Sequence, residues 1–319
     1  MSKMEEWKKK LADKYNRSVE KSKIQKPEKV LDSKQKEENI IRWILPLYQG
    51  LYSEENIGFL GKWSAAHPGL VFTKYPFFWG KKKDTKKDAW EDDLPHGGNS
   101  AKYGYLKKFI EFYNKKEETF KELLEKHNYR RDILFKCIGA QIVDFKTSWR
   151  FVSGLGVAHP METGFIFDPV VGVPYLPGPS VKGIVRAWAE EWQAEDKEEI
   201  LHFFGSESKD EKAKKQNGAV IFFDAYPLDW PVLELDVMNV HYKDYYESSK
   251  GKFIPPADYL SPTPIFFLTV ASGNKFRFAL APSSDGNNED VEKAKDWLKQ
   301  ALNNIGAGGK TAVGYGYMD

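Results

Sequence analysis

Three polar side chains in one loop near the middle of the chain have the types needed for acid–base chemistry. His159, Glu162 and Asp168 follow an apolar stretch that ends near Val152. An imidazole can act as a general base toward a hydroxyl group while a carboxylate orients it. Their spacing singles out no catalytic pair, and His159 precedes Pro160, so it can equally be a turn residue bonded to backbone. We favour the structural interpretation.

Two basic residues follow that loop, at the start of a predicted helix. Ser180 has the residue type of a helix N-cap. Lys182 and Arg186 are four residues apart, off the apolar stripe that begins at Val181. Cations beside the unpaired N–H groups of a helix N-terminus suit a bound phosphate. The alternatives are a solvated flank of a core helix and an ion pair between Arg186 and Glu190.

A second candidate for anion binding lies at the C-terminus. Five glycines fall within eleven residues, next to Lys310 and Thr311; they are Gly306, Gly308, Gly309, Gly314 and Gly316. Glycines let a backbone approach a ligand closely and present N–H groups to phosphates. The GGKT run is not a nucleotide-binding P-loop, because position 304 is Asn and a predicted strand follows instead of a helix. A plain tight turn is the alternative.

The two stretches together resemble the RAMP superfamily of RNA-binding CRISPR proteins. The matching pieces are GLGVAHPMETGFIFDPVVGVPYLPGPSVKGIVR (154–186) and GAGGKTAVGYGY (306–317). The resemblance covers roughly residues 140–319, and within the superfamily it points to the sixth-subunit family of the type III-B Cmr effector complex. Pro179 departs from the family pattern, which more often has a small hydroxyl residue there.

The resemblance implies an RNA-binding structural subunit of an RNA-guided interference complex. Such a subunit caps the backbone filament and contacts guide CRISPR RNA toward its 3′ end, near target RNA. Its protein partners are the repeated backbone subunit, the small helical subunit and the first Cmr subunit. The expected RNA-binding residues are Arg150, Ser180, Lys182, Arg186, Gly306, Gly308, Gly309, Lys310 and Thr311. The alternative is a metal-independent RAMP ribonuclease that uses His159 and Asp168. We expect no metal, no cofactor and no enzymatic activity.

The elements that position these stretches follow an α+β pattern. Apolar periodicity predicts strands at 142–152, 218–226, 232–240, 265–272, 275–281 and 311–317, and helices at 180–193, 196–204 and 288–304. Without the extra pairing strands the order is β-α-β-β-α-β, which is the ferredoxin-like, RNA-recognition-type arrangement. Many unrelated functions use this fold, so the order alone does not identify one.

A polar, aromatic excursion at about 241–264 interrupts this pattern. It corresponds to the place where related backbone subunits insert a thumb-like hairpin. Tyr245 and Tyr246 are candidates to wedge beside bases, and Lys250 and Lys252 to meet phosphates. The alternative is a flexible surface loop, which its Ser-Ser-Lys-Gly-Lys tip favours.

The N-terminal part divides into two predicted regions. Residues 1–38 are a charged, flexible arm, and residues 39–135 are a helical and irregular extension that packs on the 136–319 domain. The clearest amphipathic helix is predicted at 103–127.

The overall composition limits the kind of nucleic-acid surface, membrane association and cysteine chemistry that the chain can have. The 48 basic and 46 acidic residues leave a net charge of +2, so any nucleic-acid surface must gather its cations locally. No apolar run is long enough to span a membrane, and no signal core follows the N-terminus, so we expect a cytoplasmic protein without a membrane partner. Cys137 is the only cysteine and is predicted to be buried.

Overall fold

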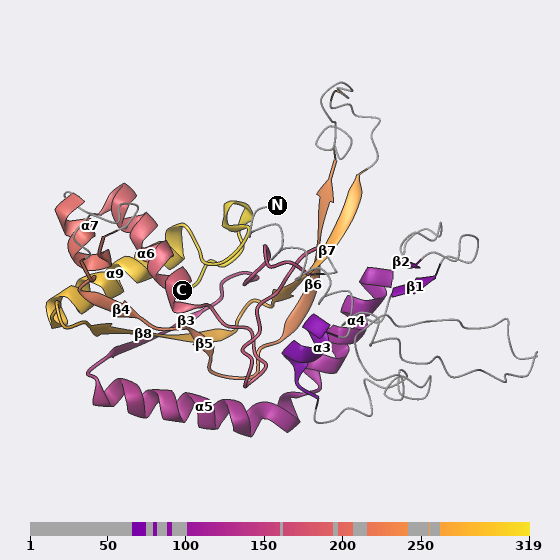
Figure 1. The fold of residues 1–319 in the computed structure, drawn as a ribbon, viewed down its shortest axis with the longest axis horizontal. Coiled ribbons are helices and arrows are strands. Elements are labelled where there is room, and N and C mark those ends of the chain that lie inside the picture. The colour runs from indigo at the N-terminus through magenta and orange to yellow at the C-terminus, as the bar shows by residue number, and fades with distance from the viewer. Residues whose placement is uncertain are drawn as a thin grey trace, which may run out of the picture. The chain divides into compact units, whose positions relative to one another are not determined.

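The computed structural model describes residues 66–74, 79–81, 88–90, 101–159, 162–193, 197–206, 216–241, 255 and 262–319 (Figure 1). The chain divides into two units, residues 1–40 and 41–319, and every described residue belongs to the second. The predicted arm at 1–38 lies outside the described residues, as does most of the extension up to residue 100. The predicted domain boundaries at residues 38 and 135 stay predictions.

The main sheet is antiparallel. Strand β3 (Gln141–Lys146) pairs with β8 (Lys275–Pro282), which also pairs with β4 (Val220–Phe222) and the two-residue β5 (Tyr226–Pro227). The strand predicted at 218–226 is therefore two short strands, and the one predicted at 142–152 ends at Lys146. Beyond that point, an isolated bridge joins Phe151 to Val270.

The strand predicted at 311–317 is wrong. Residues Thr311–Val313 form the 3-10 turn η3, and Gly314 and Gly316 have φ values of +99° and +76°. Backbone in that region cannot continue an extended ladder. The chain regains a sheet contact only at Met318, which bridges Thr147 in antiparallel fashion.

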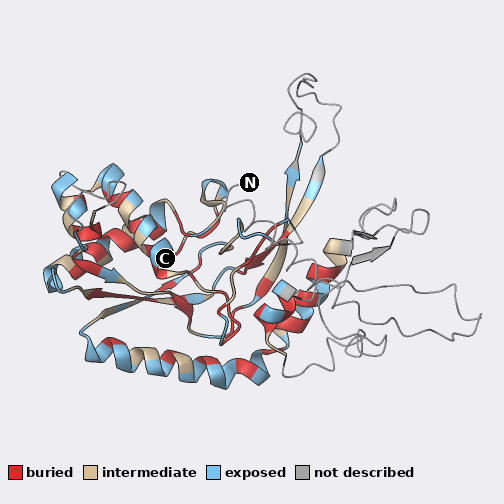
Figure 2. Ribbon diagram, in the orientation of Figure 1, coloured by how far each residue is buried: buried red, intermediate tan, exposed pale blue. Residues whose placement is uncertain are grey.

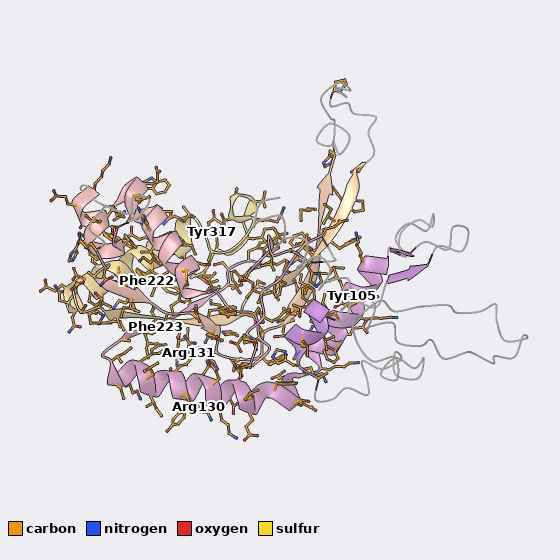
Figure 3. The ribbon with its side chains drawn as sticks, viewed as in Figure 1. Tyr105, Arg130, Arg131, Phe222, Phe223 and Tyr317 are labelled. Atoms are coloured by element: carbon orange, nitrogen blue, oxygen red, sulfur yellow. The ribbon has the colours of Figure 1, made fainter. Side chains whose placement is uncertain are left out.

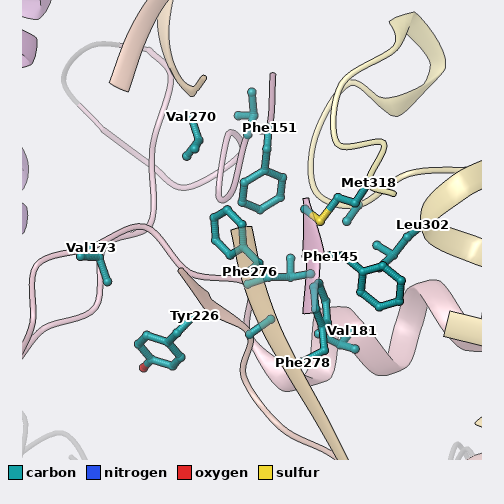
Figure 4. Packing of buried hydrophobic residues seen from close by; sticks show 14 of the residues in the cluster. Phe145, Phe151, Val173, Val181, Tyr226, Val270, Phe276, Phe278, Leu302 and Met318 are labelled. Carbon is teal, nitrogen blue, oxygen red and sulfur yellow. The ribbon is translucent and has the colours of Figure 1, made fainter. Parts of the chain in front are cut away.

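One face of the sheet is covered by helices α6 (Gly178–Trp192) and α9 (Asn288–Asn304), with α7 (Lys197–Phe204) beside α6. Figure 4 shows Val181 of α6 and Leu302 of α9 packing around Phe145, Phe278 and Met318. The α9 bounds match the prediction, because Asn287 starts the helix with a capping box to Asp290.

The other face carries α5 (Glu117–Cys137). Successive strand residues face opposite sides, so Arg277, next to the buried Phe276 and Phe278, reaches Asp132 of α5 at 2.8 Å. Figure 3 shows Arg131 of α5 directed toward the sheet and Arg130 directed away from it. Cys137 ends this helix and is exposed, so its predicted burial is wrong.

The helix predicted at 103–127 is two helices, α4 (Ala101–Asn114) and α5. In an unbroken helix the Tyr113 carbonyl would accept from residue 117. Here it accepts from the N–H of Lys116 at 2.9 Å and from the indole of Trp230 at 3.2 Å. The Asn114 amide bonds both backbone groups of Leu233. Tertiary partners thus end α4, which buries Tyr105, Phe109 and Tyr113 near the short α3 (Pro68–Lys74).

Strands β6 (Leu233–Val240) and β7 (Thr263–Val270) form a separate antiparallel ribbon, with Leu233 opposite Val270. Burial falls along it, from Leu233 and Val270 inside to the exposed Val237 and Asn239 (Figure 2). A third small pairing joins β1 (Trp79–Lys81) to β2 (Asp88–Trp90). Within the described part of the chain, no helix has the length and apolar character to cross a membrane.

Candidate nucleic-acid interface

The two stretches singled out in the sequence lie against each other. The glycine loop, residues 306–317, docks on residues 148–155, which follow β3. The N–H groups of Gly309 and Gly316 donate to the carbonyls of Val152 and Arg150, both at 2.8 Å. The Ser148 N–H donates to the Tyr317 carbonyl at 2.9 Å. Two segments that are more than 150 residues apart in the chain therefore form one backbone-bonded unit.

Most of the loop's glycines are required by close backbone approaches, either to residues 148–155 or within the loop. A Cβ on Gly308 would lie 2.1 Å from the Val152 carbonyl oxygen, and one on Gly316 would lie 1.8 Å from that of Ala307. Gly306, Gly308 and Gly316 also have positive φ values. The close backbone approach predicted from these glycines is thus made to the chain itself. Gly314 differs, because the space around its Cβ position is open.

Some donors of the loop remain available after docking. No described residue accepts from the N–H groups of Gly308, Lys310 or Thr311. Lys310 has a left-handed backbone with φ of +61°, and its ammonium lies 3.6 Å from the Met238 sulfur and 5.7 Å from the centre of the Phe267 ring. Three N–H groups and one ammonium within four residues are a set of groups that suits an anion.

Arg150 lies beside this loop but is held by carboxylates. Its Nε donates to Glu234 at 2.8 Å and its Nη1 to Asp236 at 2.7 Å. Tyr315 of the glycine loop donates to the same Asp236 oxygen at 2.5 Å. The hydrogen bond to Glu234, with the charges of both acids, raises the pKa of Arg150 despite its partial burial. The predicted phosphate ligand is therefore already paired with two anions.

The first turn of α6 does not have the open donors that the sequence predicted. The N-cap is Pro177, so Ser180 lies inside the helix and makes no capping bond. The Gly178 N–H donates to the Asp224 carboxylate at 2.6 Å, and the N–H groups of Ser180 and Val181 both reach the Pro177 carbonyl. Position 179 is proline and has no N–H. An anion from the chain itself thus occupies this helix end.

The two cations of α6 share one flank, as predicted. They are four residues apart in α6, which puts them on neighbouring turns of one side of the helix. Burial, and then the charge of Arg186, lower the pKa of Lys182. Arg186 donates from Nε to Glu190 at 2.6 Å. This is the ion pair that the sequence left as an alternative to phosphate binding. Exposed pairs of this kind are weak, so the pair does not prevent Arg186 from exchanging partners.

The candidate catalytic residues are embedded in the fold. Asp168 is only 6% exposed; one carboxylate oxygen accepts from the N–H groups of Val170 and Val171, and the other from the Tyr226 hydroxyl at 2.7 Å. His159 stacks on Phe72 with 4.2 Å between ring centres. Its Nε2 lies 3.0 Å from the Phe72 carbonyl, which can only accept, so Nε2 carries the hydrogen.

Comparison with known proteins places this geometry in a family. A model of the RAMP superfamily matches residues 142–319, more than half of the chain, including both docked stretches. The chain belongs to the RAMP superfamily. Within it the chain is Cmr6-like: the CRISPR system Cmr subunit Cmr6 of Pyrococcus furiosus is 32% identical over 62% of this chain and 73% of that protein. The Cmr6 subunit of Saccharolobus solfataricus is 29% identical over 81% of each chain.

A solved structure adds a likeness in fold. One chain of the cryo-EM structure of the type III-B Cmr-beta complex bound to cognate target RNA has a TM-score of 0.50 and 24% sequence identity. The match covers 83% of this chain and 85% of that chain. At this identity the likeness concerns the fold alone.

Four residues were predicted to form the tip of a thumb. Tyr245, Tyr246, Lys250 and Lys252 lie outside the described residues, between the ends of β6 and β7. The ribbon formed by β6 and β7 begins beside the glycine loop, because Asp236 of β6 bonds Tyr315.

Sequence reasoning missed two side chains that the structure singles out. Trp149 is an exposed tryptophan on the segment that carries the glycine loop. Arg131 lies over the Tyr226 ring at 4.3 Å and donates to the Asp224 carbonyl. The sequence carried a signal for Trp149, since aromatic residues beside basic ones can stack on the bases of a single strand. For Arg131 it carried none, because its partners are about 90 residues away.

Proposed function

We propose that this chain is a structural, RNA-binding subunit of a type III-B CRISPR RNA-guided interference complex, the Cmr complex. One observation carries the proposal: the glycine loop keeps the N–H groups of Gly308, Lys310 and Thr311 without acceptors among the described residues, next to the Lys310 ammonium. Family membership and the names of its relatives support the same role.

In this role the subunit contacts the guide CRISPR RNA toward its 3′ end and caps the filament of repeated backbone subunits. Its further partners are target RNA, the small helical subunit and the first Cmr subunit. Contacts to phosphates fix position without reading sequence, so guide–target pairing is left to read the sequence. We assign the complex to the cytoplasm, with no membrane partner.

The finer fold that we propose is a ferredoxin-like core with a thumb. Two features support the core: the antiparallel order Met318–β3–β8–β4, and the helices α6 and α9 that follow β3 and β8. The ribbon of β6 and β7, with 241–264 at its far end, supports the thumb.

We propose that the chain is not a nuclease. Both oxygens of Asp168 are used by backbone and by Tyr226, and His159 binds a carbonyl through Nε2. Labelled RNA incubated with the purified chain in EDTA should stay intact. Cleavage that is lost in the His159→Ala variant would instead establish the metal-independent ribonuclease.

The test of RNA binding is a salt titration with the full chain and a labelled single-stranded RNA. Lys310→Asn removes the ammonium while keeping a residue that tolerates positive φ. It should lower the affinity and reduce the dependence of log K on log salt by about 0.7, the value of one single-strand phosphate contact. Lys299→Asn, at an exposed lysine of α9, is the matched control and should change neither. Equal slopes for Lys310→Asn and wild type would contradict phosphate binding at the loop.

A further inference from the structure

We propose that Trp149 is a stacking platform for one unpaired base of the bound RNA. The inference rests on the proposed RNA-binding function and adds a base contact to it. Trp149 is 51% exposed, whereas most large aromatic residues of the described chain are buried. Aromatic side chains on single-strand-binding surfaces stack on bases of any sequence, because every base has a π face.

The segment that carries Trp149 is held on both sides. The Ser148 N–H donates to the Tyr317 carbonyl at 2.9 Å, and the Arg150 carbonyl accepts from Gly316 at 2.8 Å. Thr147 bridges Met318 and donates from its N–H to Asn274 at 2.9 Å. A side chain on such a segment needs little further ordering when it binds, which favours affinity.

The charges around the indole suit a base better than a phosphate. The Arg150 guanidinium lies 5.4 Å from the centre of the Trp149 ring. It is already paired with Glu234 and Asp236, so this corner has one cation and two carboxylates. A phosphate would be repelled by that excess of negative charge, whereas a neutral base would not. The Arg also orients the ring through a cation–π contact.

Trp149 lies beside the glycine loop, and this position favours RNA as the molecule that contacts its indole. Ser148 and Arg150, the neighbours of Trp149, bond directly to Tyr317 and Gly316 of the loop that keeps free donors at Gly308, Lys310 and Thr311. The platform requires a strand that places a phosphate at those donors and a base against the indole. Phosphate contacts next to an aromatic platform are the usual combination in single-strand binding.

Trp192 provides a matched control within the same chain. It is 59% exposed, but it stacks on Trp188 with 4.7 Å between ring centres and lies at the C-terminal end of α6. Trp149 has no aromatic ring against it in the described part of the chain. Loss of either indole removes a similar exposed apolar area, so a difference between the two variants reports position and not hydrophobicity.

The experiment compares two labelled strands of about 12 nucleotides, one with bases and one with an abasic ribose–phosphate backbone of equal length. Trp149→Ala and Trp149→Leu should weaken binding of the base-bearing strand by about 5- to 100-fold, while Trp149→Phe keeps most of the affinity. Binding of the abasic strand and the salt slope should not change. Trp192→Ala should bind both strands like wild type, and circular dichroism should match for all variants.

Two results would overturn the platform. Equal affinity of Trp149→Leu and wild type for the base-bearing strand would assign the exposed indole to a protein contact. An equal loss for both strands would make Trp149 a residue that positions the backbone-binding loop. If the wild-type chain bound neither strand, the proposed function itself would fail, which is a separate outcome. Binding of the base-bearing strand by wild type, with loss confined to that strand in the variants, supports the platform.

Discussion

The glycine loop and the first turn of α6 were both predicted to bind phosphate through backbone N–H groups. In the structure, the N–H groups of the α6 turn have acceptors within the chain, whereas several of those in the glycine loop have none among the described residues. At α6 the Asp224 carboxylate takes the Gly178 N–H, and Pro177 takes the next two donors. At the glycine loop, three N–H groups have no acceptor in the described chain. A helix N-terminus is thus an anion site only when no carboxylate of the same chain has filled it.

The largest effect should come from breaking the docking of the glycine loop. Gly308→Val places a Cβ 2.1 Å from the Val152 carbonyl oxygen and forces a β-branched residue to φ of +81°. We expect the free energy of unfolding in urea to fall by about 3 kcal/mol or more, with RNA binding lost as a consequence. Gly314→Ala is the control: its φ is also positive, but its Cβ has open space, so the loss should be about 1 kcal/mol. Similar losses for the two variants would mean that backbone strain, and not docking, explains these glycines.

A smaller effect should follow from opening the helix end that the chain has filled. Asp224→Ala removes the acceptor of the Gly178 N–H and should lower the free energy of unfolding by about 1 kcal/mol, as for other N-terminal caps. RNA affinity should not decrease, because the Asp224 carboxylate and the Pro177 carbonyl already take the donors of this helix end. Asp229→Ala, at an exposed acid, is the control for charge. Weaker RNA binding by Asp224→Ala alone would show that the first turn matters to RNA after all.

Lowering the pH should decrease the free energy of unfolding without changing the N–H donors of the glycine loop. Burial lowers the pKa values of His67, His127 and His159 below the ordinary value of 6.5. The unfolded chain therefore binds more protons than the folded chain once the pH falls through about 6.5. The free energy of unfolding should be at its full value above that pH and should decline as the pH drops toward the lowered values.

Urea titrations at several pH values check this sign, and His127→Gln should decline less steeply than wild type. Backbone N–H groups do not titrate here, so the salt slope of RNA binding should stay constant wherever the protein is folded. A stability that rises on acidification would mean that one of these histidines gains an anionic partner in the fold.

The smallest effect should come from the α6 cations. Because Arg186 pairs with Glu190 and the first turn is closed, Lys182→Ala with Arg186→Ala should change the salt slope less than Lys310→Asn does. Two full phosphate contacts would give a change of about 1.4, at about 0.7 for each. A decrease of that size would show that Lys182 and Arg186 both bind phosphates, so that α6 and the glycine loop would not differ in RNA binding.

The sequence determined the features that depend on neighbouring residues. The apolar spacing of 288–304 predicted α9 to the residue, and the Asn287 capping box that starts this helix is also a local feature. The two glycine-rich stretches were enough for the family, which the superfamily match confirmed. The α+β class was right in its coarse form: helices pack on antiparallel sheets.

Only the tertiary structure decided which polar groups stay open. Asp224 is 46 residues from Gly178, and Asp236 is 86 residues from Arg150, so no local pattern could show that these donors were already paired. The same holds for the break after Asn114, where Leu233 and Trp230 supply the partners. The number of donors and acceptors is a property of each residue. Whether a donor is already paired depends on which acceptor groups the fold places within about 3 Å of it.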